Sequence, residues 1–432
     1  MTTAQGQPTG AKGPPPSPAI ALWAVAAAFG TYFCMYVFRK PFTAASYAGG
    51  EVFGLPEKTV LVTTQVFGYM LSKVVGIRVI AELPPARRAL GLLVLVGAAE
   101  LALLGFAVMP SPMHAACLFV NGLALGMVFG LVLGFLEGRR TTEALAAGLC
   151  ASFILADGVA KSVGTWLLDQ GVSERMMPGL ADLLFVPPIL LFVGMLSRVP
   201  PPDKEDVIHR GERSAMDRHD RAAMIRGHGL GLMLLIGVYL LVTIARSVRA
   251  DFMPEIWRGL GVEAAPETFA RSEVLVAFFV LASNGLSVLI RDNRRAFFAA
   301  IGVAMVGGLM MLAALAGLRR GSLDGLTFMV LVGIGLYLPY VVIHTTIFER
   351  LIAMTRDRGN LGFLMYLADA VGYLGYVVLM LTQGLIPTGP SFLTFFSVIC
   401  GVIAVLTCLS LAASWVYYAR RTSALKPPVA EV

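Results

Sequence analysis

The sequence predicts an all-α, polytopic membrane protein of the major facilitator type: twelve transmembrane helices in two six-helix halves, with both termini cytoplasmic. Of its 432 residues, 57% are hydrophobic and 14% charged, which leaves too little polar surface for a water-soluble domain. Apolar runs of about 20 residues recur along the chain, and a helix of that length crosses ~30 Å of hydrocarbon. Short motifs of the first half also return in the second.

The apolar runs define the domains. In the N-terminal half, residues 19–199, they lie near 19–40, 58–80, 88–109, 113–136, 143–168 and 179–199. In the C-terminal half, residues 229–418, they lie near 229–248, 270–291, 296–317, 324–346, 360–382 and 391–418. The remaining segments are a Pro- and Gly-rich tail (1–18), predicted to be disordered, a charged cytoplasmic linker (200–228) and a cytoplasmic C-terminal tail (419–432).

Basic residues give the orientation in the lipid bilayer. With the N-terminus in the cytoplasm, most of the 34 lysines and arginines fall on cytoplasmic segments, above all on the linker. The net charge of +7 is then an orientation signal, and no nucleic-acid partner is needed to explain it. The first apolar run is expected to remain as an uncleaved helix.

Two motifs recur at one spacing. "LADGV" (Leu155–Val159) returns as "LADAV" (Leu367–Val371), 212 residues later, and the same distance separates Glu137 from Glu349. Two independent features at one offset indicate that the halves are copies of each other. Such a parallel repeat is typical of transporters with two six-helix halves.

Arginines near the ends of spans one and seven are candidate substrate ligands. Tyr32, Tyr36, Arg39 and Thr43 share one helix face, and Tyr239, Thr243 and Arg246 repeat the first three steps of this pattern in span seven. A guanidinium inside a span costs roughly 2.5–3.5 kcal/mol near its centre. Both arginines either snorkel to the interface or bind substrate, with Tyr32, Tyr36 and Tyr239 as hydrogen-bonding partners. The second half does not repeat Lys40, which is expected to be an anchor.

Other charged residues lie deeper in the spans. Span two carries a polar stripe that must face protein or water, and its Lys73 is a candidate substrate ligand. Asp157 and Lys161, four residues apart, are either a plain ion pair or one that opens with substrate or proton. Asp369 repeats Asp157, but Tyr373 stands where a lysine would be expected.

These charges give a second set of candidates. Asp369, without a basic partner on its own helix, is the better proton-binding candidate, and Glu100 is a weaker one. Asp157, Lys161, Asp369, Glu137 and Glu349 form the predicted coupling or gating group.

The remaining small and polar residues of the spans are expected to be structural. Five glycines of span four, each four residues apart from Gly122 to Gly138, predict close approach of another helix. Asn121 and His344 are expected to be structural, and the five cysteines to be core residues. Without a metal-ligand cluster, a nucleophile motif or a phosphate-cradling loop, the sequence predicts neither an enzyme nor a cofactor or metal.

Several segments resemble a known family. "YFCMYVFRKPFTAASY", "GYMLSKVVGIRVIAE", "FLEGRRTTEALAAGLCASF", "IRDNRRAF" and "RGNLGFLMYLADAVGYLG" are together similar to the bacterial family catalogued as domain of unknown function 5690. The likeness extends from about residue 19 to 420. That family is grouped with the major facilitator superfamily, so the resemblance implies this fold in a bacterial inner membrane and brings no established substrate.

"YVFRKPF" (Tyr36–Phe42) also resembles the first-helix signature of organophosphate:phosphate antiporters. In those proteins one arginine of helix one and one of helix seven bind the phosphoryl group, which implies that role for Arg39 and Arg246. Pro41 stands where that family prefers asparagine, and span seven is otherwise unlike it. A small organic anion, with phosphorylated metabolites included, is therefore the expected substrate.

The expected protein is a secondary active transporter that works by alternating access. Its cavity would be lined by spans one, two, five, seven, eight and eleven, and its counter-ion would be a proton or phosphate. Two alternatives remain open: a proton-coupled carrier of neutral or cationic solutes that uses Asp157 or Asp369, and a non-transporting sensor of the same fold.

Overall fold

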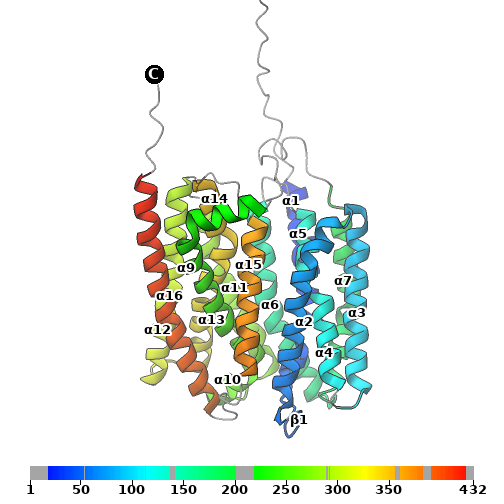
Figure 1. Ribbon diagram of the computed structural model, residues 1–432. Helices are drawn as coiled ribbons and strands as arrows, with labels where there is room; N and C mark the ends of the chain where they lie inside the picture. The colour runs from blue at the N-terminus through cyan, green and yellow to red at the C-terminus, as the bar shows by residue number, and fades with distance from the viewer. Residues whose placement is uncertain are drawn as a thin grey trace, which may run out of the picture.

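Long helices run side by side in the computed structural model of the chain (Figure 1). The structure describes residues 18–52, 54–111, 113–136, 142–200, 218–288, 290, 292–355, 361–382 and 391–424. Glu137, nearly all of the predicted N-terminal tail, most of the linker and the last part of the C-terminal tail lie outside these residues.

The helices of the first half follow the predicted runs. They are α1 (Pro18–Val37), α2 (Glu57–Glu82), α3 (Arg88–Val108), α4 (Met113–Leu125), α5 (Val128–Leu136), α6 (Thr142–Asp169) and α7 (Met177–Ser197). Short 3-10 turns η1 (Pro41–Ala44) and η2 (Pro85–Arg87) and a hairpin of β1 (Glu51–Val52) and β2 (Leu55–Pro56) connect them. The fourth predicted span is divided in two by a turn at Gly126 and Met127.

The second half begins with α9 (Arg218–Asp251), which kinks at His228 and then turns down into the bundle (Figure 1). It continues through α10 (Met253–Gly259), α11 (Pro266–Val288), α12 (Asn293–Arg319), α13 (Gly325–Val342), the π-helical turn η3 (Ile343–Ile347), α14 (Phe348–Thr355), α15 (Leu361–Leu381) and α16 (Ser391–Ala424). Asp292 and Asp324 accept hydrogen bonds from the first backbone N–H groups of α12 and α13, as N-cap residues do.

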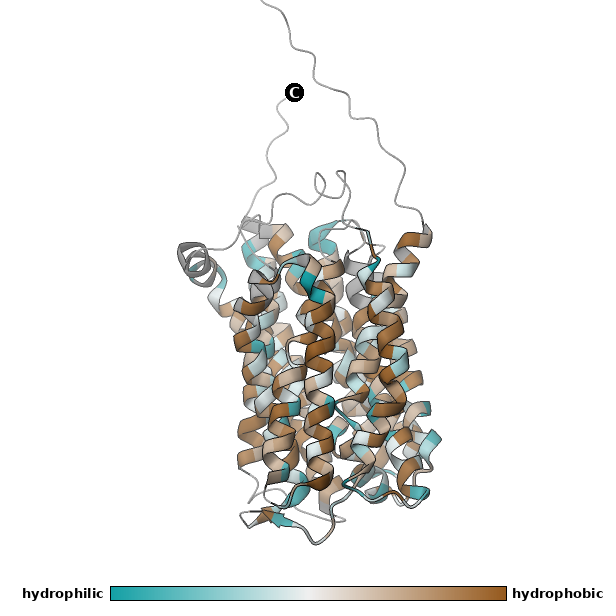
Figure 2. Cartoon of the chain, turned by 90° about the vertical axis from the view of Figure 1, so that its right-hand side faces the viewer, coloured by the Kyte–Doolittle hydropathy of each residue, from teal (hydrophilic) through white to brown (hydrophobic). Residues whose placement is uncertain are grey.

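Hydrophobic residues make up most of the helices along the sides of the bundle (Figure 2). Large hydrophobic residues stay exposed there, among them Leu101 and Val108, which are 70% and 79% exposed. Within the described residues, 8 helical segments are long and apolar enough to cross a membrane. The predicted spans near 19–40, 58–80, 143–168 and 270–291 coincide with α1, α2, α6 and α11, which fall outside that set. The chain is therefore an integral, multi-pass membrane protein.

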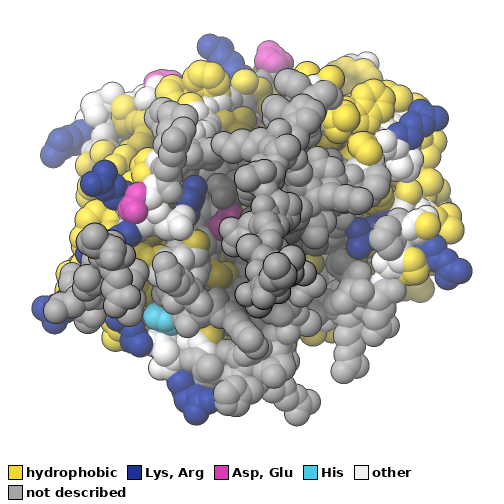
Figure 3. All heavy atoms as spheres, turned by 90° about the horizontal axis from the view of Figure 1, so that it is seen from above, with side chains coloured by type: hydrophobic (Ala, Val, Ile, Leu, Met, Phe, Trp, Pro, Cys, Tyr) yellow, Lys and Arg dark blue, Asp and Glu magenta, His cyan; other side chains and the backbone are white. Residues whose placement is uncertain are grey.

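The helices form two groups. Within the first, α2 packs on α4 and α1 on α6 and α7; within the second, α12 packs on α13 and α16 on α9. The two groups meet where α6 packs on α11 and α2 on α15. α1 begins and α16 ends at the upper end of the bundle, and β1 and α10 lie at the lower end (Figure 1). On the upper face, the visible charged side chains are mostly Lys and Arg, spread around the rim (Figure 3).

Glycines bring α2 and α4 into backbone contact. A Cβ atom placed on Gly122 would lie 2.0 Å from the carbonyl oxygen of Gln65, and one on Gly126 would lie 2.5 Å from that of Tyr69. The predicted close approach of a second helix is thus confirmed at these two glycines. It fixes the height of Gln65, Tyr69 and Lys73 along the bundle.

Substitution of Gly122 tests this contact. We expect Gly122→Ala to lower the free energy of unfolding by about 1–3 kcal/mol, because the backbone of α2 must move away. Gly97→Ala is the matched control: Gly97 lies in α3 with nothing within 4 Å of its Cβ position, so the change should be neutral or slightly stabilising. The apparent melting temperature of the purified protein in detergent measures both. Equal melting temperatures of the two variants would contradict the contact.

Candidate functional site

A small central cavity lies between the two groups of helices. Its volume is about 10 Å³, close to the space of one water molecule, so its own side chains nearly fill it. Aromatic and charged residues line it: Tyr32, Tyr36, Tyr69, Lys73, Phe129, Phe153, Arg246, Tyr340, His344, Asp369 and Tyr373. Buried charges in a membrane protein mark functional sites, which makes this cavity the candidate site.

The lining differs from the predicted set of spans. Spans four and ten contribute Phe129, Tyr340 and His344, whereas none of the described lining residues comes from α11, the expected span eight. The reason is local. A turn at Gly126 ends α4 and α5 starts anew beside Phe129, and the π-helical turn that follows Pro339 shifts the helix face at His344.

Proline ends the first helix earlier than predicted. Because Pro41 has no N–H and disfavours the α conformation before it, α1 ends at Val37 and Arg39 and Lys40 lie in a turn. Thr43 therefore does not continue the helical face with Arg39, and that expectation was wrong. Its hydroxyl donates to the carbonyl oxygen of Lys40 at 2.7 Å.

Two amide side chains hold this turn. Gln65 donates from Nε2 to the carbonyl oxygen of Arg39 at 2.8 Å, and Asn121 donates from Nδ2 to that of Phe38 at 3.0 Å. The two side chains also bond each other, at 2.8 Å. The structural role expected for Asn121 is confirmed, and its effect is to position Arg39.

Aromatic rings surround both candidate arginines. The Cζ atom of Arg39 lies 3.8 Å from the ring centre of Tyr69, and that of Arg246 lies 4.5 Å from the ring centre of Tyr340. The two side chains are 2% and 3% exposed, and among the described residues neither forms an ion pair. Cation–π contacts stabilise such guanidinium groups but leave their charge uncompensated.

Lys73 forms an ion pair with Asp369, which joins α2 of the first group to α15 of the second. Asp369 has no basic residue on its own helix, as expected, but its partner comes from the other half of the chain. Tyr239 donates a hydrogen bond to the second oxygen of Asp369, and its Oη lies 3.2 Å from Nδ1 of His344. His344, expected to be only structural, faces the cavity.

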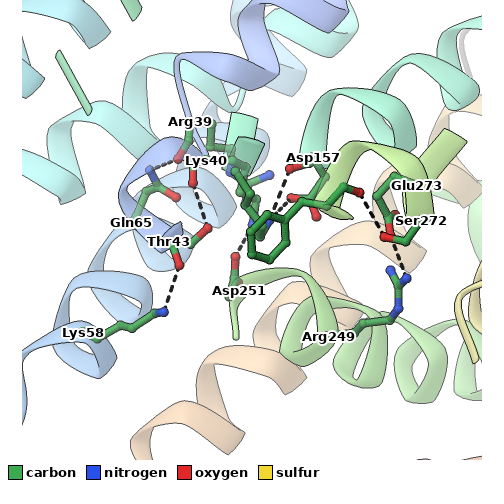
Figure 4. Close-up of polar contacts among 12 residues, drawn as sticks. Arg39, Lys40, Thr43, Lys58, Gln65, Asp157, Arg249, Asp251, Ser272 and Glu273 are labelled. Atoms are coloured by element: carbon green, nitrogen blue, oxygen red, sulfur yellow. Dashed lines mark hydrogen bonds and ion pairs between the residues drawn. The ribbon is translucent and has the colours of Figure 1, made fainter. Parts of the chain in front are cut away.

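Among the described residues, four further ion pairs of a lysine or arginine with a carboxylate lie towards the end of the bundle that carries α10, with side chains at most 18% exposed. Figure 4 shows several of these residues, among them Lys40, Asp251, Arg249 and Glu273. We call these ion pairs the lower charge layer: Lys40–Asp251, Lys58–Glu255, Lys161–Asp157 and Arg249–Glu273. The first two join the two helix groups, and the third is the predicted i,i+4 pair within α6, with 2.8 Å between Nζ and Oδ1. Lys40 is 2% exposed, so its expected role as an anchor in lipid was wrong.

Charge is balanced in the lower charge layer and unbalanced around the cavity. The layer holds four cations and four carboxylates. Of the charged side chains that line the cavity, Lys73 and Arg246 are cations and Asp369 is a carboxylate. Arg39 does not line the cavity but stacks on Tyr69, which does. With Arg39 counted, the described residues at and next to the cavity carry an excess of two positive charges when these groups are ionised.

Most of the lower charge layer was missed by sequence reasoning. The predicted span seven ends at residue 248, before Arg249, Asp251 and Glu255. In the structure α9 extends to Asp251, and Glu255 lies in α10. Glu273 stands inside the predicted span eight, and that position alone could have singled it out. Of the other coupling candidates, Glu349 lies in α14, away from the cavity lining.

Comparison with known proteins places the chain in a sequence family and a fold. The sequence model of a family of unknown function (DUF5690) matches residues 41–421. No curated protein matches the chain in sequence.

Three solved structures share the fold. A D-xylose–proton symporter has a TM-score of 0.61 at 15% identity, covering 91% of this chain and 96% of its own. The human organic anion transporter MFSD10 (TETRAN) has a TM-score of 0.57 at 14% identity, covering 91% and 99%. A mutant of the nucleoside transporter NupG has a TM-score of 0.58 at 11% identity, covering 92% and 99%. The chain is similar to these transporters in fold.

A double-mutant cycle tests the pair Lys40–Asp251. Removing one partner leaves a buried charge, so we expect Lys40→Met and Asp251→Asn each to lower the free energy of unfolding by about 3–5 kcal/mol. The loss of unfolding free energy in the double variant should be about 0.5–3 kcal/mol smaller than the sum of the losses in the two single variants. Thermal unfolding in detergent measures all three, with Arg319→Met, at an exposed position, as the control that changes little. Simple additivity of the two losses would show that the charges do not interact.

Proposed function

The chain belongs to the DUF5690 family, and we propose that it is a secondary active transporter which carries a small organic anion across the membrane by alternating access. In this proposal, the two six-helix halves, residues 19–199 and 229–418, give twelve spans and place both termini in the cytoplasm. The location would be the inner membrane of a bacterium. The lower end of the bundle would then face outward.

One observation carries the substrate class: the excess of two positive charges around the central cavity. Placing an unpaired guanidinium in a membrane interior is unfavourable, so Arg39 and Arg246 need a function that offsets this cost. Two guanidinium groups suit the oxygens of a phosphoryl group or a carboxylate, because each can donate two parallel hydrogen bonds. Tyr32, Tyr36 and Tyr239 would add hydroxyl donors.

The contacts of the halves suggest how access would alternate. Lys40–Asp251 and Lys58–Glu255 bridge the two groups of helices at the lower end, and the cavity is nearly filled. This conformation is therefore closed at the lower side. Opening that side would require both ion pairs to separate, whereas Asp157–Lys161 lies within α6 and would move as one unit.

Lys73–Asp369 offers a route to coupling. An incoming anion would compete with Asp369 for Lys73, and the carboxylate, released into a buried site, would take up a proton. Tyr239 and His344 would pass that proton or hold the neutral acid in place. A proton is thus the proposed coupling ion; phosphate, exchanged at the same arginines, is the other.

The same carboxylate favours a second candidate function. A proton-coupled carrier of neutral or cationic solutes would also use an ionisable group in contact with the cavity, and Asp369 is in that position. The two candidates differ in the arginines. A neutral or cationic substrate gains nothing from Arg39 and Arg246, so their removal separates the two.

The arginines give the principal test. A ligand-induced thermal-shift screen of phosphorylated sugars, carboxylates and nucleosides on the purified protein should yield an anion that stabilises it. We expect Arg39→Ala and Arg246→Ala each to weaken binding of that anion by about 10- to 100-fold, since each removes charged hydrogen bonds. Arg320→Ala is the matched control. Arg320 is exposed, follows the end of α12 and does not line the cavity, so this variant should bind the anion normally.

Uptake into reconstituted vesicles extends this test to transport. If every anion screened is taken up equally by the wild type, Arg39→Ala and Arg246→Ala, the anion assignment is wrong. Selective stabilisation by nucleosides or other neutral solutes would favour the second candidate.

Proton coupling has its own measurement. We expect substrate uptake to alkalinise the side from which substrate enters, and Asp369→Asn to abolish this pH transient because an amide cannot take up the proton. Glu267→Gln changes an exposed carboxylate and should leave the transient intact. A transient that persists in Asp369→Asn would exclude this carboxylate as the proton site.

A further inference from the structure

A groove separate from the central cavity lies between α9 and α16. Its volume is about 730 Å³, within the range of about 300–1,000 Å³ that small-molecule sites occupy. Leu230 forms one wall, Ala412, Ala413 and Val416 form the other, and Tyr417, Arg420 and Arg421 stand at its upper end.

The groove has an identifiable local cause. α9 kinks at His228, in the glycine-rich stretch "GHGLG" (residues 227–231), so its upper part leaves the line of the bundle. At Gly231 there is no room for a Cβ atom, which would lie 2.4 Å from the hydroxyl of Tyr418 and 2.7 Å from the ring of Tyr417. The helices thus touch at Gly231, and the small side chains of Ala412 and Ala413 leave space beside the contact.

This groove opens to the hydrocarbon of the bilayer. Residues Phe392–Arg421 of α16 form a helical segment long and apolar enough to span a membrane. Its outward side chains are large and apolar along the whole length: Val402, Leu409 and Val416 are 55%, 63% and 48% exposed. Trp415, 40% exposed, lies near the end of this band, as tryptophans do at membrane interfaces. An acyl chain is therefore the natural neighbour of the apolar walls.

The upper end of the groove is basic and ordered. Arg421 donates from Nη1 to Oη of Tyr417 at 2.9 Å, one helical turn away, and its Cζ lies 5.9 Å from that ring. This contact holds the guanidinium along α16, and the neighbouring Arg420 also lines the groove.

We infer that this groove binds an anionic phospholipid, with the phosphate on Arg420 and Arg421 and one acyl chain along Leu230, Ala412, Ala413 and Val416. The two parts of the site match the two parts of such a lipid. A free phosphate would make no use of the apolar walls, and a zwitterionic lipid would bring its own cation towards the arginines. The inference concerns the bilayer surface of the protein and does not depend on what the central cavity carries.

Native mass spectrometry of the purified, delipidated full-length protein tests the inference. Phosphatidylglycerol and phosphatidylcholine with identical acyl chains are added separately, and the fraction of protein carrying one lipid is measured. We expect phosphatidylglycerol to be retained at least about tenfold better, and Arg420→Gln/Arg421→Gln to remove this preference. Arg319→Gln/Arg320→Gln is the matched control: it neutralises another exposed pair, at the lower end of α12, and should keep the preference.

A second variant tests the apolar part without a change of charge. Ala413→Phe should fill the groove and lower phosphatidylglycerol binding by about tenfold while Arg420 and Arg421 remain. Glycerol phosphate, which has the head group without acyl chains, should bind weakly to wild type. Any of four results would overturn the assignment. These are equal retention of both lipids by wild type, equal loss of the preference in both arginine-pair variants, undiminished phosphatidylglycerol binding by Ala413→Phe, and strong binding of glycerol phosphate.

Discussion

Burial of charge in a low-dielectric interior is the constraint on which this structure depends. The chain places eight charged side chains of its lower charge layer, and four more around its cavity, in a bundle whose outer surface is hydrocarbon. Each such group must be matched by an opposite charge, hydrogen bonds or an aromatic ring, because bulk water does not solvate it. The matching partners come largely from other helices, so satisfying the charges also fixes how the helices stand against each other.

The two ways of matching divide the buried charges into two regions. In the lower charge layer every cation has a carboxylate, and two of the pairs join the halves, which gives a closed and specific contact. Around the cavity, within the described part of the chain, the two arginine side chains form cation–π contacts with tyrosine and phenylalanine rings and no ion pair. Rings can move aside and leave a cation free for a ligand, whereas an ion pair must first be broken. Balanced charge therefore suits a gate, and unbalanced charge suits a binding site.

The comparisons fit this division. The solved transporters share the fold with 11–15% identity, so the arrangement of helices tolerates almost complete replacement of side chains. Such a bundle requires little more than apolar helices long enough to span the membrane, small residues where the helices touch, and polar residues at the helix ends. The chemistry of transport then rests on a few inward residues, which such a likeness does not carry over. In this chain those residues have to be judged from Arg39, Lys73, Arg246 and Asp369 themselves.

The sequence by itself determined the membrane class, the helical bundle and the close contact at Gly122 and Gly126, because apolar length and glycine spacing act within one helix or between neighbours. It also singled out Arg39, Arg246, Lys73 and Asp369, since a charge in an apolar run is visible without a structure. Only the tertiary structure decided their partners. Lys73 and Asp369 are 296 residues apart, and Lys40 and Asp251 are 211 apart. No local pattern links such positions, because their pairing depends on how two separate helix groups meet.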